Sequence, residues 1–469
     1  MLTFGSYFCF DMPSVLQDKF QGNPCNMTNN MTDINSTCCN DCLGLAPDEY
    51  NLLYAIYAWT NAVIVIAAGF LIDKLGNRIG VFLFSGLCVL GSCSFAAGAF
   101  LKGTSAMLPI MLLGRLLFGA GNGSLTIVQN RITAFWFKDK ELAMAFGITL
   151  AFSRLGSVLN FLLTANFADA YGLTWTLWGG SVLCGVGFMS AIVVSFLDIY
   201  GVKQLGQDAN LKLSSKNVKV GDIKRFSLQY WLLALTIMFF YNGIFPFVAD
   251  ASKFIQDKYG YKQTSAYMAG AVYDVSMVLS PFLGGVIDVF GRRGILAISC
   301  AVLTIPVFGL LGFTEVHPLV STLWLGITYS VAAASLWPSI PLVVSQATIG
   351  TAMGLTTSIQ MVGIGLSNIV VGQILGNTEK IPRLDTLLRW KYVMIFLLAN
   401  VLACVVTAFF LNMVDRRRGG VLNASRKEKL ASQQVATPVS LPDGRLDAAN
   451  DEATETDPLL PNSRQPSLN

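Results

Sequence analysis

Hydrophobic residues are gathered into long runs that alternate with short polar segments. A helix needs about 20 residues to cross the roughly 30 Å of hydrocarbon in a bilayer. Runs of that length cover residues 50–72, 79–101, 107–130, 143–165, 173–197, 228–250, 265–287, 294–314, 320–345, 351–375 and 390–412. The pattern predicts an all-α polytopic membrane protein, embedded in membrane lipids, in which each of these runs is a complete span.

The chain begins with a shorter apolar run that stops at Asp11. Its ten or so residues are about half of what a spanning helix needs. We interpret the run as the second half of a first helix that starts upstream, which brings the expected number of helices to twelve. A secretory signal is the poorer alternative, because the segment has no basic n-region and no small-residue cleavage site.

Composition agrees with a membrane protein and argues against other classes. The chain is 53% hydrophobic and only 13% charged, about half the charged fraction of a soluble domain. Its net charge of +4 is spread out without blocks of like charge, so no nucleic-acid partner is expected. No nucleophile–base pair, metal-ligand cluster or phosphate loop stands out. We therefore expect no enzyme, no cofactor and no bound metal.

Basic residues in short loops predict the orientation, because such loops stay in the cytosol. They fall in alternate connections, at Lys74 and Arg78, Lys138 and Lys140, Arg292 and Arg293, and Arg416 to Arg418. These connections are assigned to the cytosol. Both termini are cytosolic as well once a twelfth helix is allowed.

The first loop, about 11–48, then lies on the opposite, luminal face. It carries three glycosylation sequons, at Asn26, Asn30 and Asn35, and four cysteines, Cys25, Cys38, Cys39 and Cys42. Glycans and paired thiols belong to an oxidising compartment. We expect glycans on these asparagines and disulfides among these cysteines, with the pairing left open. The other cysteines lie in apolar runs and are expected to pack there.

A ten-residue pattern occurs twice in the loops, at matching points of two halves of the chain. The first copy runs from Gly69 through Asp73 to Arg78, and the second runs from Gly284 through Asp288 to Arg292 and Arg293. Each has a small residue, a carboxylate one turn later, a glycine and a basic residue. The small residue permits close helix approach, and the Asp can accept from a facing helix N-terminus or from a basic side chain.

This doubled pattern resembles the signature of the major facilitator superfamily. The segment Gly114-Arg115-Leu-Leu-Phe-Gly119 is similar to the arginine-glycine helix of that superfamily; helix packing by small residues is its alternative interpretation. The resemblance implies two six-helix bundles around a site of alternating access. The domains are then 1–200 and 227–413, joined by a cytosolic linker at 201–226 and followed by a disordered cytosolic tail at 414–469.

Further motifs, from Gly5 to about Arg417, are similar to one branch of the superfamily, the lysosomal dipeptide transporters. They include Phe4-Gly-Ser-Tyr-Phe-Cys9, Ser153-Arg-Leu-Gly-Ser157, Leu336-Trp-Pro338 and Ser358-Ile-Gln360. The resemblance implies a uniporter of dipeptides in the lysosomal membrane, with a glycosylated accessory membrane protein as partner. One departure concerns the carboxylate that the branch has in a Gly-Glu-Ser-Leu segment. This chain has Gly123 in its place.

Two charged residues inside the runs are the first candidates for substrate binding, because a charge in a bilayer is costly unless paired or hydrated. At 1.5 Å per residue, Arg154 lies roughly 18 Å and Asp274 roughly 21 Å from the cytosolic ends of their helices. By family resemblance the two helices face one cavity. Arg154 suits the carboxylate of a zwitterion and Asp274 its ammonium. A structural ion pair that never meets substrate is the alternative.

Polar and aromatic residues at comparable depth are the remaining candidates for a cavity lining. They are Trp59, Asn61, Asn130, Asn160, Tyr241, Tyr273, Trp337 and Gln360. Each fits equally well as an interhelical hydrogen bond or as a packing ring.

The polar tail contains Glu455-Thr-Asp-Pro-Leu459-Leu460. This segment resembles the acidic dileucine signals that clathrin adaptors bind, and it favours a lysosomal address.

Two other functions fit the same sequence. One is a proton-coupled carrier of another small solute, such as a sugar or an organic anion, in which Asp274 titrates. The other, from a different class, is a membrane scaffold or receptor that transports nothing. Flux measured in reconstituted vesicles distinguishes them.

Overall fold

A computed structural model describes residues 2–16, 19–20, 41–45, 47–137, 141–204, 220–261, 264–375, 383–425 and 428. Within these ranges, 11 helices are long and apolar enough to cross a membrane. They coincide with the hydrophobic runs, so the predicted spans are confirmed. Several helices extend a turn or more into the flanking polar segments, for example to Phe137 and to Arg417.

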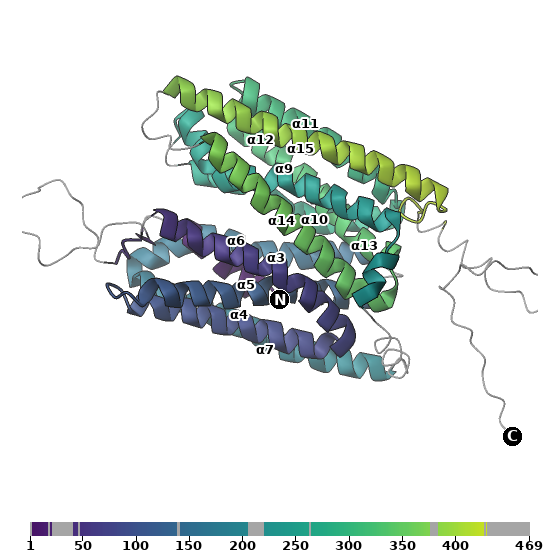
Figure 1. Cartoon of the computed structure of the whole chain (residues 1–469), viewed down its shortest axis with the longest axis horizontal. Coiled ribbons are helices and arrows are strands. Elements are labelled where there is room, and N and C mark those ends of the chain that lie inside the picture. Colours follow the sequence, from purple (N-terminus) through teal and green to yellow (C-terminus); the bar gives the residue numbers. More distant parts are fainter. Residues whose placement is uncertain are drawn as a thin grey trace, which may run out of the picture.

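The N-terminal bundle is the purple and blue half of Figure 1. It consists of α1 (Phe4–Val15), α3 (Pro47–Leu75), α4 (Asn77–Phe100), α5 (Met107–Phe137), α6 (Leu142–Tyr171) and α7 (Leu173–Gln204). Small residues set its closest crossing, between α4 and α5. A Cβ atom at Gly91 or at Gly114 would collide with the backbone of the facing helix, so glycine permits the approach.

The C-terminal bundle is the teal to yellow half of Figure 1. After the short helix η1 (Val220–Arg225) come α9 (Leu228–Tyr259), α10 (Ser265–Phe290), α11 (Arg293–Phe313), α12 (Pro318–Leu336), α14 (Ile349–Leu375) and α15 (Arg383–Arg417). Three short pieces link α12 to α14: η2 (Trp337–Ser339), α13 (Ile340–Val343) and η3 (Gln346–Thr348). Pro338 and Pro341 lie in these pieces, where a missing backbone N–H interrupts regular helix.

The first helix corrects the expected start of the luminal loop. Helix α1 does not stop at Asp11 but continues through it to Val15, with Pro13 also inside the helix. Its 12 residues measure about 18 Å. The carboxylate of Asp11 lies within the helix bundle beside Ser157 and within electrostatic reach of Arg154 and Arg115, so Asp11 does not mark the end of the helix.

The cysteines divide as expected where the structure describes them. Cys42, in the first loop, is disulfide-bonded. The thiols in the apolar helices are free, and Cys9, Cys88, Cys184, Cys300 and Cys404 among them are buried. Other sequence features lie outside the described residues, namely Cys25, Cys38, Cys39, the sequons at Asn26, Asn30 and Asn35, and the dileucine segment at Glu455, Leu459 and Leu460.

Candidate functional site

The first copy of the repeated pattern forms a contact between the bundles at the end of α3 that the basic loops predict to be cytosolic. We call this contact the Asp73 gate, and the corresponding contact at Asp288 the Asp288 gate. The carboxylate of Asp73 accepts hydrogen bonds from the backbone N–H groups of Gly350 and Thr351, at 2.9 and 2.5 Å, and from the Thr351 hydroxyl at 2.7 Å. Arg131 Nε donates to it at 2.9 Å. Asp73 is fully buried and lies against the N-terminal turn of α14, where a helix favours negative charge.

The second copy forms a matching gate at the cytosolic end of α10. The carboxylate of Asp288 accepts from the backbone N–H groups of Ala143 and Met144, at 2.9 and 2.8 Å, at the N-terminus of α6. Arg293 donates to it at 2.8 Å. The predicted acceptor role of the carboxylate is therefore seen in both copies.

Glycines bring each pair of helices together, but the basic residues differ from those expected. A Cβ at Gly69 would collide with the carbonyl oxygen of Gly350, and one at Gly284 would collide with that of Ala143. Arg78 lies 4.0 Å from Asp198, with 43% of its side chain exposed. Arg292 is exposed. The gate ion pairs come from Arg131, which lies outside the first copy, and from Arg293, the second of the two arginines that end the second copy, whereas Arg78 and Arg292 lie away from the carboxylates.

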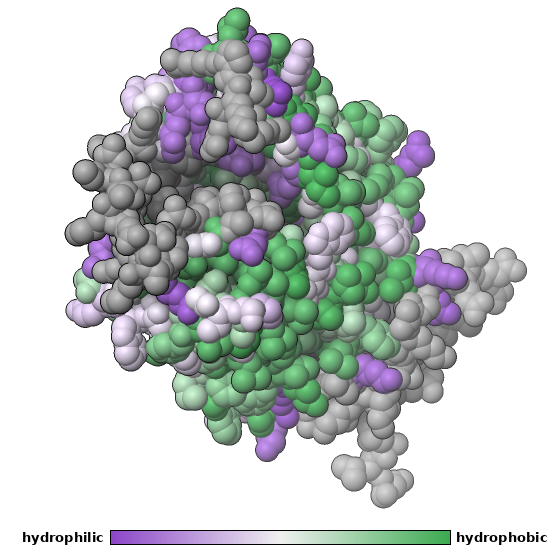
Figure 2. Space-filling model, turned by 60° about the vertical axis from the view of Figure 1, so that its left-hand side comes forward, coloured by the Kyte–Doolittle hydropathy of each residue, from purple (hydrophilic) through white to green (hydrophobic). Residues whose placement is uncertain are grey.

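The bundles are joined at the cytosolic end and separated at the other. Both gates lie at the end that carries the basic loops. On the opposite end, which Figure 2 brings forward, the surface is hollowed between the bundles, and hydrophilic side chains line the visible part of the recess. Apolar side chains cover much of the flank beside it. This is a conformation open toward the non-cytosolic side.

Arg154 connects the two bundles near the middle of the protein. From α6 its guanidinium donates to the hydroxyl of Tyr329 on α12 at 2.6 Å. It lies over the rings of Tyr273 and Tyr7, 4.5 and 5.4 Å from their centroids. The residue is only 7% exposed, and it forms no ion pair with any described carboxylate. Its Nε–H has no hydrogen-bond partner in the described part of the chain.

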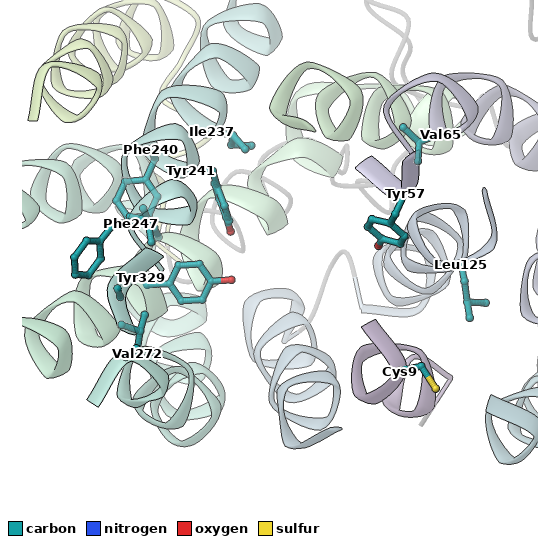
Figure 3. Close-up of a cluster of buried hydrophobic side chains, with 14 of the residues drawn as sticks. Cys9, Tyr57, Val65, Leu125, Ile237, Phe240, Tyr241, Phe247, Val272 and Tyr329 are labelled. Carbon is teal, nitrogen blue, oxygen red and sulfur yellow. The ribbon is translucent and has the colours of Figure 1, made fainter. Parts of the chain in front are cut away.

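Aromatic side chains of the C-terminal bundle extend this cluster. Trp337 Nε1 donates to the hydroxyl of Tyr241 at 2.8 Å, and the Tyr241 ring lies 5.8 Å from that of Tyr329. Figure 3 shows the hydroxyls of Tyr241 and Tyr329 pointing toward the N-terminal bundle. Arg154, Tyr273, Tyr241 and Trp337, all predicted as site residues, therefore belong to one group.

Asp274 does not join this group. It follows Tyr273 on α10 and is half-buried, and burial is the dominant influence on its carboxylate. No ion pair links it to Arg154 among the described residues. The side chains of neighbouring residues on a helix point about 100° apart. When Tyr273 lies against Arg154, Asp274 therefore points away from Arg154. The structural ion pair, which was the alternative to substrate binding, is not seen among the described residues, and a role for Asp274 in substrate binding stays a prediction.

The other predicted lining residues differ in burial and in hydrogen bonding. Asn61 is buried on α3, with no partner for its Oδ1 among the described residues, and Gln360 is buried on α14. Trp59 is 50% exposed, and Asn130 is partly buried on α5. Asn160 accepts from Thr164 within α6.

Arg115 occupies the interior of the N-terminal bundle rather than the Asp73 gate. Its guanidinium lies 4.6 Å from the ring centroid of Phe95 and 5.4 Å from that of Tyr54. It is 2% exposed and lines a small cavity together with Cys9 and Met12 of α1. On α5 it lies 16 residues before Arg131, the residue that contacts Asp73, so it is not part of that contact, and a gating role for Arg115 stays a prediction.

Three residues near Arg154 were not predicted: Tyr7, Tyr329 and Asp11. Asp11 is half-buried and lies next to Ser157, within electrostatic reach of Arg154 and Arg115. The sequence offered one indication that Asp11 is functional, namely that it is a carboxylate in an apolar run. Because that run is short and Asp11 ends it, the pattern indicated the end of a helix at Asp11. Tyr7 and Tyr329 are single aromatic hydroxyls in apolar segments, a pattern too common to identify a site.

The doubled gate and the two-bundle fold agree with the known proteins that this chain is similar to. The family model described as Major Facilitator Superfamily matches residues 3–368. The chain belongs to the major facilitator superfamily. It is 31% identical over 440 residues to the lysosomal dipeptide transporter MFSD1 of Bos taurus, covering 91% of this chain and 86% of that protein. Identity to the MFSD1 of Homo sapiens is 30% over 440 residues, covering 91% and 87%. These identities place the chain in the MFSD1 family.

Solved structures of this superfamily share the fold. A proton:xylose symporter, XylE, superposes with a TM-score of 0.64 at 13% identity, covering 92% of this chain and 97% of that one. A bacterial homologue of the iron transporter ferroportin, in an outward-facing state, gives a TM-score of 0.65 at 14% identity and covers 88% and 97%. The predicted fold class, two major facilitator bundles, is thereby confirmed.

Proposed function

We propose that this chain moves dipeptides across the lysosomal membrane by alternating access, as a passive uniporter. The observation that carries the proposal is the state of Arg154: a buried guanidinium, in contact with both bundles, that donates to a tyrosine and forms no ion pair within 4 Å with any described carboxylate. A buried cation without a directly bound counter-ion is costly. A substrate carboxylate would supply that counter-ion through two parallel hydrogen bonds.

The names of its relatives support the substrate class and the compartment. The MFSD1 proteins of Bos taurus and Homo sapiens are lysosomal dipeptide transporters. On this basis, Leu459 and Leu460 are proposed to bind a clathrin adaptor, and a glycosylated membrane protein is proposed as an accessory subunit. Glycans on Asn26, Asn30 and Asn35 are part of the same proposal.

The transport cycle follows from the contacts that must change. Substrate enters from the lumen while the gates at Asp73 and Asp288 hold the cytosolic end closed. A carboxylate that binds Arg154 competes with the Tyr329 hydroxyl for the guanidinium, and so alters the link between α6 and α12. For release into the cytosol, the hydrogen bonds from α14 to Asp73 and from α6 to Asp288 must break while the luminal ends of the bundles approach each other.

A binding screen with purified protein tests the substrate class. A ligand that binds only the folded state raises the melting temperature. Dipeptides are expected to raise it, whereas free amino acids and sugars should leave it unchanged. Stabilisation by a sugar or an organic anion alone would support the proton-coupled alternative. In vesicles, absence of flux for every ligand that binds would support the scaffold or receptor.

A further inference from the structure

The missing carboxylate at Gly123 leaves open which group binds the substrate ammonium. We infer that Asp11 on α1 is this group, and that Asp11 and Arg154 bind the two ends of one dipeptide. The inference rests on the proposed function and adds a specificity-determining residue to it.

Helix geometry places Asp11 on the side of α1 that faces Arg154. Tyr7 and Asp11 are four residues apart, and Arg154 and Ser157 are three apart, so each pair shares one helix face. The Tyr7 ring lies 5.4 Å from the Arg154 guanidinium, and Asp11 lies beside Ser157. Two stripes of side chains, one on α1 and one on α6, therefore face each other.

Close packing fixes this register. A Cβ at Gly156 would collide with the carbonyl oxygen of Phe4 and would lie 3.3 Å from the backbone nitrogen of Phe8. Gly156 lies between Arg154 and Ser157 in sequence, so the contact holds α1 against the functional stretch of α6. Movement of Asp11 relative to Arg154 would require the two backbones to separate.

The spacing of the two charges suits a dipeptide. Asp11 and Arg154 interact electrostatically, but no ion pair within 4 Å joins them in the described part of the chain. Tyr7, which touches Arg154, is four residues, or about 6 Å along the helix, from Asp11. The amino and carboxyl ends of an extended dipeptide are at most about 7 Å apart. A zwitterion with this separation fits between a carboxylate and a guanidinium that do not touch each other.

The other carboxylate positions fit less well. At Gly123 there is no carboxylate, and any side chain there would collide with Oδ1 of Asn61. For Asp274, burial is the influence on the carboxylate, and no electrostatic interaction with Arg154 accompanies it. Asp11 is the described carboxylate that interacts with Arg154 across the proposed substrate position.

A purely structural role for Asp11 makes a different prediction. Asp11 also interacts with Arg115, whose Nε and one terminal nitrogen have no hydrogen-bond partner among the described residues. If Asp11 serves only to neutralise Arg115, its removal destabilises the ligand-free protein but leaves the recognition of a peptide amine unchanged. The test must therefore measure ligand discrimination as well as stability.

The experiment measures the affinity of purified protein for three ligands: a dipeptide, the same dipeptide N-acetylated, and the same dipeptide C-amidated. Acetylation removes the ammonium and amidation removes the carboxylate, so wild type should bind both modified ligands more weakly. In Asp11→Asn the free dipeptide should bind about 10- to 100-fold more weakly, the range for one charge-assisted hydrogen bond. Acetylation should then cause no further loss, while amidation still should.

Three variants serve as controls. Asp11→Glu keeps the charge and should retain the preference for the free amine. If Asp11→Asn does not fold, Asp11→Ser replaces it, and the same result is expected. Asp274→Asn should retain the penalty for acetylation; loss of that penalty here, and not in Asp11→Asn, assigns the amine to Asp274 and overturns the inference.

Two further outcomes separate the inference from the proposed function. If wild type binds the dipeptide but Asp11→Asn still discriminates against the acetylated form, the inference is wrong while the proposed function stands. If wild type binds none of the three ligands, the proposed function is wrong and the inference falls with it.

Discussion

The two gates have the same sequence pattern but different ion pairs. At Asp73, three donors come from the facing helix α14, and the cation, Arg131, comes from α5. At Asp288, two backbone donors come from α6, and the cation, Arg293, comes from the start of the next helix in the same bundle. Each gate therefore ties three helices together, and each ion pair stays within one bundle. The gates differ in the number of donors from the other bundle, three at Asp73 and two at Asp288, and in the helix that supplies the cation.

A second difference concerns what supports each cation. Arg131 also donates to Asn77 in the turn that follows Asp73. The turn that carries Arg293 is held instead by the segment after α15, since the backbone N–H of Arg293 donates to the carbonyl of Leu422 at 3.0 Å. The pattern thus determines where each carboxylate lies, and the surrounding packing determines which cation it meets.

The largest expected effect is at Asp73. Asp73→Asn removes the charge and leaves Arg131 without its buried partner, which costs about 3–5 kcal/mol. Because the lost contacts join the bundles, the cytosolic end should open. Spin labels at Lys74 and Gln346, both exposed at this end, should move apart. An unchanged distance would contradict the assignment of Asp73 to the gate.

Asp288→Asn should also destabilise the protein and open the cytosolic end, but by less than Asp73→Asn. It loses two cross-bundle hydrogen bonds rather than three, at a carboxylate that is 6% exposed rather than fully buried, for which we expect about 2–3 kcal/mol. The comparison needs both variants in the same melting and distance measurements. An effect at Asp288 larger than that at Asp73 would show that cross-bundle donors do not determine gate strength.

The support beneath the second gate gives a third prediction. Asn423 donates to the carboxylate of Asp415 at 2.8 Å and to Asn412 at 3.0 Å, and its own Oδ1 accepts from the N–H of Ile295 at 3.2 Å. Asn423→Ala should lower stability by about 1–2 kcal/mol. It should also increase hydrogen exchange at the Arg293 turn without changing exchange near Asp73. Equal changes at both places would exclude a support specific to the Asp288 gate.

The smallest effect is expected at a basic residue of the motif itself. Arg78 is exposed and lies 4.0 Å from Asp198. Exposed pairs contribute little, so Arg78→Gln should change the free energy of unfolding by no more than about 0.5 kcal/mol. Its melting temperature is compared with that of Arg131→Gln, which should fall much further. Equal losses would show that the two arginines share the role.

The sequence predicted the spans and the acceptor role of the two gate carboxylates, because the first depends on local hydrophobicity and the second on a repeated pattern. The substrate role of Arg154, chosen from its depth and from family resemblance, stays a prediction. The sequence did not predict that Arg131 pairs with Asp73, since this depends on how α5 crosses α3. The choice of Asp274 rested on depth alone, and depth does not give the rotation of a helix about its axis. Asp11 was not predicted as a site residue, because a charged residue at the end of a short apolar run is also typical of the end of a helix.

The central claim is that Arg154 binds the carboxylate of a transported dipeptide. Its most direct test is uptake of a labelled dipeptide into liposomes that contain either wild type or Arg154→Lys. Lysine keeps the positive charge but lacks the planar, two-pronged donor. The account predicts saturable uptake by wild type without a pH gradient, and loss of most of that uptake in Arg154→Lys with the melting temperature of the ligand-free protein preserved. Equal uptake by the two proteins, or uptake by wild type only under a proton gradient, would contradict it.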